Sequence, residues 1–412
     1  MTKPTTRTLA SGGTLIVEKI PGVRSAGVCW LVPIGSATDP DGRLGRAAIL
    51  EEMLMRGAGE LDSRAQADAF DRLGAGRGAS AGTTHMRLSL TCLGSALLES
   101  LALLGDMALR PRLGADALGP AKDLAIQAIE SLADDPQERC VYAARERHYD
   151  PPFNRSGLGT REGIAAVTRD EIAGAWSAAS APSGWIVAAA GDVDVDAIEV
   201  ALNGMSGKTS DSAPDFARAK GAPRGYAHEE DDSNQVQIVV VHDAPLETHE
   251  DSVLERVVVS VLAGGMSGRL FTEVREKRGL CYTVSASYRA DKEFAGVSAY
   301  VGTTPERAQE SLDVLLAELE RIRGGVEPDE FQRAIVGMKS RLVFAGESTS
   351  ARAGALCGDQ RVRGRPRSLD ERTAEIDGVT LERVNAYLAR RDPGRLTIQT
   401  LGPSALTPPE GM

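Results

Sequence analysis

Helical and strand-like hydrophobic periodicities alternate along the chain, without the regular strand–helix–strand order of a parallel sheet. The runs 14–20, 86–93, 235–241 and 283–288 have the alternating or clustered apolar residues that are typical of strands. Strands that are interleaved with pairs of helices favour an antiparallel sheet covered on one face. We therefore predict an α+β fold with mostly antiparallel sheets and helices packed on one face of each.

One pattern occurs twice, half a chain length apart. The segments 164–191 and 376–402 each read as an Ile/Val-Thr start, a helix and a strand that ends in glycine. Thr168 with Glu171 three residues later is a capping box, and Thr380 is in position to cap the equivalent helix. Because the two segments keep the same register throughout, we interpret the chain as two homologous domains.

The boundary between the copies is indicated by composition. The segment 204–225 is rich in glycine, serine and proline, which suits a surface linker. We expect one domain at 1–203 and a second at 226–412.

Charge and composition exclude several classes of protein. The 412 residues include 47 Lys and Arg against 58 Asp and Glu, a net charge of −11, and no basic run with interleaved aromatics. A nucleic-acid partner is therefore not expected, because phosphate binding depends on basic surfaces. The apolar run 185–190 is far shorter than the ~20 residues of a membrane span.

The expected compartment is the cytoplasm. The N-terminal segment has no apolar stretch of signal-peptide length. The number of cysteines is odd and none forms a CxxC pair, which is typical of reduced thiols. They are Cys29, Cys92, Cys140, Cys281 and Cys357.

The segment 45–57 is helical by composition, and positions 48 and 52 lie one turn apart on the same face. It resembles the signature helix of the insulinase/pitrilysin zinc peptidases, the family that includes mitochondrial processing peptidase, whose inverted motif is H-x-x-E-H. Similar residues occur along nearly the whole chain. They lie at 70–75, 79–81, 83, 101–106, 134–136, 264–271, 274–282 and 401–403.

The resemblance implies a zinc site whose ligands are missing from this chain. The two histidine positions hold Ala48 and Glu52, and only the general-base position is retained, as Glu51. The downstream carboxylate ligand falls at Ala128, with Glu130 two residues beyond it and turned away from that site. A catalytic zinc needs three nitrogen or oxygen ligands, and alanine offers none.

No replacement ligands are evident. Adjacent helical residues such as Glu51 and Glu52 point about 100° apart and do not chelate one ion comfortably. The histidines show no paired ligand spacing on a helix; they are His85, His148, His228, His242 and His249. We therefore predict that this chain has no metal site or catalytic residue of its own, and that Glu51 and Glu52 lie on a solvated or chamber-lining helix face.

A second part of the family's machinery is retained. Arg275 and Tyr282 resemble the Arg/Tyr pair with which these enzymes contact substrate at the zinc, and the resemblance implies that they bind substrate. An arginine presents a rigid set of donors to carbonyl oxygens, and a phenol hydroxyl can stabilise an oxyanion. The spacing alone favours an arginine in the charged run 273–278 and a half-buried strand tyrosine. The resemblance along the whole chain favours a retained substrate contact instead.

These features lead to three functional hypotheses. The first is a catalytically inactive, substrate-binding subunit of a heterodimeric zinc peptidase, whose homologous partner carries an intact H-x-x-E-H motif and the zinc. In that hypothesis Arg275 and Tyr282 act on a peptide substrate in the partner's active site. The second is a structural or assembly protein of the same fold, as the core subunits of respiratory complex III are. The third, an active hydrolase with relocated ligands, has no candidate ligand set.

Overall fold

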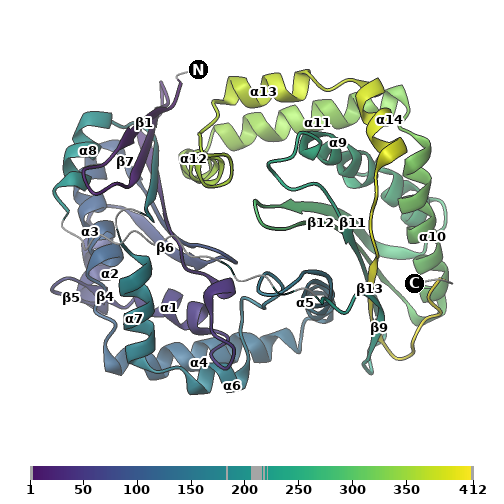
Figure 1. Cartoon of the computed structure of the whole chain (residues 1–412), viewed down its shortest axis with the longest axis horizontal. Helices are drawn as coiled ribbons and strands as arrows, with labels where there is room; N and C mark the ends of the chain where they lie inside the picture. Colours follow the sequence, from purple (N-terminus) through teal and green to yellow (C-terminus); the bar gives the residue numbers. More distant parts are fainter. Residues whose placement is uncertain (1–2, 182–183, 206–215, 217–218, 220, 410–412) are drawn as a thin grey trace. The chain divides into compact units, whose positions relative to one another are not determined.

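A computed structural model describes residues 3–181, 184–205, 216, 219 and 221–409 (Figure 1). The chain forms two compact units that are both discontinuous in sequence. Unit 1 comprises Met1–Ser131, Arg155–Arg218 and Phe344–Asp370, and unit 2 comprises Leu132–Asn154, Ala219–Val343 and Glu371–Met412. Most of the segment expected to be a linker lies outside the described residues.

Unit 1 contains a six-stranded sheet in the order β1-β2-β8-β3-β7-β6, in which only the β2–β8 pair is parallel. Strand β7 shows the two-residue period of a half-covered strand, because its alternate residues from Met86 onward are buried. The strands are β1 (Thr5–Thr8), β2 (Thr14–Lys19), β3 (Ser25–Val32), β6 (Gly76–Ala81), β7 (Met86–Leu93) and β8 (Ile186–Gly191), with a separate pair β4 (Gly57–Ala58) and β5 (Leu61–Asp62).

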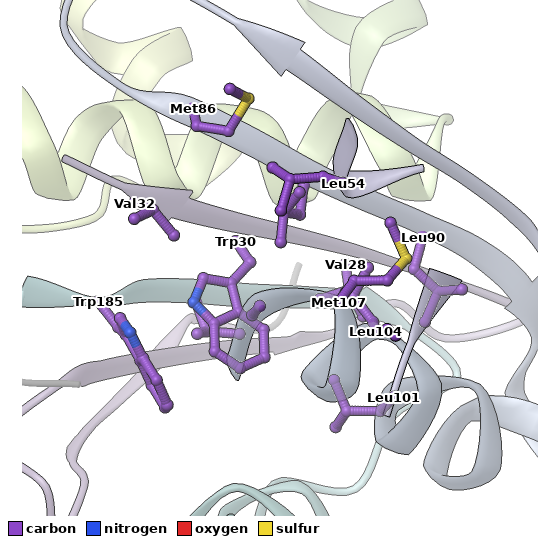
Figure 2. Close-up of a cluster of buried hydrophobic side chains, with 14 of the residues drawn as sticks. Val28, Trp30, Val32, Leu54, Met86, Leu90, Leu101, Leu104, Met107 and Trp185 are labelled. Atoms are coloured by element: carbon purple, nitrogen blue, oxygen red, sulfur yellow. The ribbon is translucent and has the colours of Figure 1, made fainter. Parts of the chain in front are cut away.

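Helices cover one face of this sheet, and the main hydrophobic core of unit 1 lies between these helices and the sheet. In helix α3, residues Leu97, Leu101 and Leu104 repeat at the three- and four-residue spacing of one helical face and are all buried. Figure 2 shows Leu101 and Leu104 in the cluster with Trp30 and Trp185. The two tryptophan rings pack edge to face, with 4.6 Å between the ring centres. The helices that belong to unit 1, wholly or for most of their length, are α1 (Arg46–Leu54), α2 (Ser63–Arg72), α3 (Leu97–Leu109), α4 (Ala115–Leu132), α6 (Arg161–Ala166), α7 (Arg169–Ala179), α8 (Val195–Asn203) and α12 (Thr349–Arg363).

The other face of the same sheet is covered by α12, which comes from the second half of the sequence. Ala353, Leu356 and Cys357 of α12 pack on Cys29 and Leu31 of β3, together with neighbouring residues of β2 and β8. Two glycines, Gly27 of β3 and Gly191 of β8, allow this close approach. A Cβ on Gly27 would lie 2.5 Å from the Ser350 nitrogen.

Unit 2 contains a five-stranded sheet in the order β11-β12-β10-β13-β9, and again one pair, β9–β13, is parallel. Its central strand, β10, is apolar on both faces, because Val239 and Val241 alternate with Ile238 and Val240 and all four are buried. The strands are β9 (Gly225–Glu230), β10 (Val236–Asp243), β11 (Cys281–Ala290), β12 (Ala295–Thr303) and β13 (Thr397–Gly402).

One face of this second sheet carries the core of unit 2, and the other face is covered by helix α5 from the first half of the sequence. Cys140 and Ala144 of α5 pack on Val239, Val241 and Leu401. The helices of unit 2 are α5 (Pro136–His148), α9 (Ser252–Ala263), α10 (Ala308–Arg321), α11 (Pro328–Gly346), α13 (Leu369–Asp377) and α14 (Leu381–Arg390), of which α11 and α13 extend across the unit boundary.

The predicted α+β class and the duplication are confirmed. The two sheets share their strand arrangement, with one parallel pair each, and Thr168 and Thr380 both cap their helices as expected. One detail differs, because each sheet has a helix from the other half of the chain on its second face. This exchange explains why the compact units do not follow the continuous boundaries 1–203 and 226–412, which were drawn from the repeated pattern.

Candidate functional site

The helix that resembles the zinc-binding helix is α1. It buries Ile49, Leu50 and Met53 in the core, which leaves Ala48, Glu51 and Glu52 on its half-buried face. The carboxylate of Asp39 accepts hydrogen bonds from the backbone N–H groups of Gly45 and Ala47, at 3.0 and 3.1 Å, and so holds the first turn of the helix.

Glu51 is committed to a structural hydrogen bond. Its Oε2 accepts from the backbone N–H of Ala81, the last residue of β6, at 2.6 Å. Burial raises the pKa of Glu51, the nearby Glu52 charge adds to that rise, and the Ala81 hydrogen bond opposes it. The carboxylate therefore satisfies a backbone donor at the edge of the first sheet.

The positions of the missing ligands do not form a metal site. Glu52 pairs with Arg56 one turn later at 3.9 Å, and Ala128 is exposed on α4. Glu130 pairs with Arg161 at 2.9 Å. Within the described part of the chain, no group of three or more His, Cys, Asp or Glu side chains has a geometry that could hold a metal ion.

A zinc ion therefore does not fit these residues. Ala48 and Ala128 have no donor atoms, and Glu51 is hydrogen-bonded to the backbone. No step of a reaction can be assigned to a metal at these positions.

The structure brings Arg275 and Tyr282 together. Arg275 lies in a short π-helical turn, η4 (Phe271–Glu276), and its Nη1 donates to the Tyr282 carbonyl oxygen at 2.7 Å. The guanidinium carbon lies 4.8 Å from the centre of the Phe271 ring and 4.9 Å from that of Tyr282. These contacts hold the guanidinium between two aromatic rings, an arrangement that suits its planar, delocalised charge.

Tyr282 is presented to solvent by an irregularity in strand β11. The pairing register with β12 shifts between Cys281 and Thr283, so Tyr282 is the extra residue of a β-bulge. Its side chain is 81% exposed.

The alternative interpretation of Arg275 as one of a set of paired surface charges is not what the structure shows. Glu273 is instead paired with Lys277 and Arg278, both at 2.8 Å. The hydrogen bond from Lys277, followed by that from Arg278, lowers the pKa of Glu273 to about 2. Arg275 makes no ion pair with any residue that the structure describes, so its remaining N–H groups are available to a ligand.

Two participants were not predicted from the sequence. Phe271 lies four residues before Arg275, a spacing at which helical side chains meet, and this was the available signal. The bond between Glu51 and Ala81 had no such signal, because it joins residues far apart in the sequence.

Two family models match most of the chain. Residues 14–151 match the family described as Insulinase (Peptidase family M16), and residues 166–338 match the Peptidase M16 inactive domain. The chain belongs to the insulinase family, peptidase family M16.

Similar proteins cover nearly the whole length. A Mycobacterium tuberculosis protein named as an uncharacterized zinc protease is 28% identical over 409 residues, which is 97% of this chain and 93% of that protein. A crystal structure described as a peptidase M16 inactive domain from Pseudomonas fluorescens superimposes with a TM-score of 0.86 at 21% identity, covering 99% and 100% of the two chains. A chain of complex III from Candida albicans has the same fold, with a TM-score of 0.83 at 14% identity and 97% and 95% coverage.

None of the described helices combines the length and the apolar character that crossing a membrane requires. All five cysteines are free thiols, and four of them are buried.

Proposed function

We propose that this chain is a non-catalytic, substrate-binding subunit of a heterodimeric zinc peptidase that acts on peptides. The proposal rests on a contrast between the zinc-ligand positions and the Arg/Tyr pair of this chain. The ligand positions Ala48 and Ala128 have no donor atoms, whereas Arg275 and Tyr282 are assembled and exposed. The proposed partner is a homologous chain with an intact H-x-x-E-H motif, which binds the zinc.

The proposed roles of the pair follow from its chemistry. Arg275 has one N–H group bonded to the Tyr282 carbonyl, and its remaining donors suit the main-chain carbonyl of a bound peptide. The Tyr282 hydroxyl makes no hydrogen bond with a described residue, and it can donate to the oxyanion that forms during cleavage. Both roles require the partner's active site, since the described residues at the zinc-ligand positions offer no donor set for a metal that would activate water. The cytoplasmic location stays a prediction.

Turnover by the complex tests this proposal. The protein is co-purified with its partner, and we expect Tyr282→Phe to lower kcat by about 100-fold or more, as loss of one oxyanion donor does. Arg275→Ala is expected to lower kcat/KM, because substrate positioning is lost. Arg278→Ala, in the same segment but paired with Glu273, is the matched control and should leave turnover unchanged.

The assembly hypothesis makes the opposite prediction. If the complex remains intact and both variants cleave peptides at the wild-type rate, the chain has a purely structural role. Zinc analysis of the separated subunits provides a second measurement. One tightly bound zinc per copy of this chain would contradict the proposal, whereas zinc in the partner alone would support it.

A further inference from the structure

Two buried cysteines face each other where α12 packs on β3 in unit 1. Along β3, Val28 and Trp30 lie in the main core, so Cys29 between them points to the opposite face of the sheet, which α12 covers. Cys357 lies on the side of α12 that packs on this face. Cys29 is 2% exposed and Cys357 is fully buried. The two thiols therefore share one small apolar cluster, although they are 328 residues apart in the sequence.

The sulfur of Cys357 lies directly against the backbone of Cys29. It is 3.2 Å from the Cys29 carbonyl oxygen and 3.5 Å from the carbonyl oxygen of Ile186 on the neighbouring strand β8. Gly27 permits this approach of helix and sheet, because a Cβ there would lie 2.5 Å from the Ser350 nitrogen. A disulfide needs such an approach, since it spans only about 4.4–6.8 Å between Cα atoms.

The surroundings make the two thiols chemically unequal. A hydrogen bond with the Cys357 side chain lowers the pKa of Cys29, burial opposes that shift, and the Arg87 charge adds to it. Burial, followed by the hydrogen bond with Cys29, raises the pKa of Cys357. Cys29 is therefore the thiol that ionises first, and the thiolate is the form of cysteine that attacks a disulfide. The hydrogen bond between the side chains also brings the two sulfur atoms next to each other.

The other three cysteines lack these features. Within the described part of the chain, Cys92, Cys140 and Cys281 make no hydrogen bond to another thiol, and Cys140 donates instead to backbone carbonyls of β10 and β13. Burial raises the pKa of all three, to about 12 for Cys140 and to about 11 for Cys281. The pair of Cys29 and Cys357 therefore combines a neighbouring thiol with a thiol that ionises more readily.

We propose that Cys29 and Cys357 are a modification site at which a reversible disulfide forms and joins β3 to α12. The Cys29 thiolate attacks one sulfur of a small-molecule disulfide, which gives a mixed disulfide and releases one small thiolate. Cys357 then loses its proton and attacks the Cys29 sulfur, which releases the second small thiolate. The two protein thiols lose two electrons and two protons, and the small-molecule disulfide takes them up as two thiols.

The burial of both thiols determines when this reaction takes place. An oxidant reaches them only while α12 is away from the sheet, either during folding or during local opening of the helix. Once α12 is docked, the same burial protects the disulfide from reductants. In a reducing compartment both residues stay as thiols, so the cross-link forms only where the surroundings are oxidising.

The cross-link is expected to stabilise the folded protein. It joins residues 328 positions apart, and closing a long loop lowers the conformational entropy of the unfolded chain. It also keeps α12 on the apolar face of the first sheet, which the helix covers. Both effects oppose unfolding in urea.

Oxidative refolding of the full-length chain tests the site. The reduced protein is unfolded in urea and refolded with a mixture of reduced and oxidised glutathione, and its free thiols are then alkylated before digestion and mass spectrometry. We expect a pair of peptides joined through Cys29 and Cys357, with the alkyl group on the other three cysteines. The urea midpoint of the oxidised protein should lie about 1 M above that of the reduced protein, and dithiothreitol added in urea should remove the difference.

The matched control is Cys281→Ser, which removes the one cysteine that is not buried. This variant should form the same cross-link and show the same rise in the urea midpoint. Cys357→Ser should leave Cys29 alkylated and should show no rise on oxidation. The peptide mapping uses the wild-type chain, so it decides the question even if Cys357→Ser does not fold.

The inference is overturned if Cys29 and Cys357 both remain alkylated after oxidative refolding, or if either joins a different cysteine. A mixed disulfide with glutathione that stops at Cys29 would also overturn it, because Cys357 would then be out of reach. So would a Cys29–Cys357 cross-link that lowers the urea midpoint, since the folded positions of the two residues would then not accommodate the bond.

Discussion

At the scale of single residues, the surroundings of a side chain decide its chemistry more than its position in a motif. Glu51 occupies the position of a general base, yet its carboxylate is bonded to the Ala81 N–H. Arg275 lies in a run of charged residues, yet it stacks between aromatic rings and makes no ion pair with a described residue. A sequence motif names these residues but does not show what they contact.

A buried histidine in unit 2 provides a prediction at this scale. Arg391 Nη2 lies 3.0 Å from His242 Nε2, and His242 Nδ1 donates to the Asp243 carbonyl oxygen, so the ring is neutral. Burial and then the Arg391 charge lower the pKa of His242 to about 4, while Glu255 opposes that shift and His148 adds to it. Because the unfolded chain binds the proton more readily, the stability that this group contributes is present above pH ~6.5 and is lost as the pH falls toward 4.

We expect this loss to amount to about 3 kcal/mol of unfolding free energy, measured by urea denaturation across that pH range. In His242→Gln, whose amide oxygen can still accept from Arg391, the loss should be reduced by most of that amount. Equal pH profiles for the wild type and His242→Gln would contradict the assignment.

At the scale of elements, close approach between backbones determines where helices can lie. The first turn of α12 crosses β3 at Gly27, where a Cβ would lie 2.5 Å from Ser350 N and 2.6 Å from Thr349 C. Both contacts are with backbone atoms, which cannot move independently of the helix. Gly191 in β8 is similarly close to the Thr349 side chain.

The substitution Gly27→Ala is expected to displace α12 and to destabilise the protein by about 2–3 kcal/mol or more, as overpacking does. Gly174→Ala in α7 is the control, because nothing lies within 4 Å of its added Cβ. It should stabilise the protein by about 0.5–1 kcal/mol through helix propensity. Urea midpoints for the two variants check both signs, and a neutral effect of Gly27→Ala would show that α12 does not pack on β3 in this way.

At the scale of the whole molecule, the two halves of the sequence each supply a helix to the other's sheet. The face of the first sheet that contains Ile16, Cys29 and Leu31 is buried by residues of α12. Without α12, this apolar face would be exposed to water. The duplicated halves are therefore not independent folding units, although each has its own sheet.

This interdependence predicts the behaviour of isolated fragments. A fragment of residues 1–203 lacks α12, so the apolar face of its sheet is exposed to water. We expect this fragment to bind the dye ANS strongly and to elute as aggregates in size-exclusion chromatography, because exposed apolar faces associate with one another. Co-expression with a fragment of residues 204–412 should restore a soluble complex of the mass of the intact chain. A soluble monomer formed by 1–203 alone, without ANS binding, would refute this prediction.

The sequence alone determined the local and chemical features of this protein. Hydrophobic periodicity and capping residues predicted the α+β fold, since these signals depend on neighbours within one or two turns. The internal repeat predicted the duplication, because it can be read by comparing one segment of the sequence with another. The loss of zinc ligands could also be predicted, because the alanines at 48 and 128 have no donor atoms in any conformation.

Only the tertiary structure decided the features that join residues distant in sequence. These are the exchange of α5 and α12, the bond from Ala81 to Glu51, and the contact of Cys29 with Cys357. Each depends on which strands pair and which faces are covered. The physical reason is that the hydrogen bonds and the burial of these residues are completed by parts of the chain that are distant in sequence. Packing of the whole fold determines which parts those are.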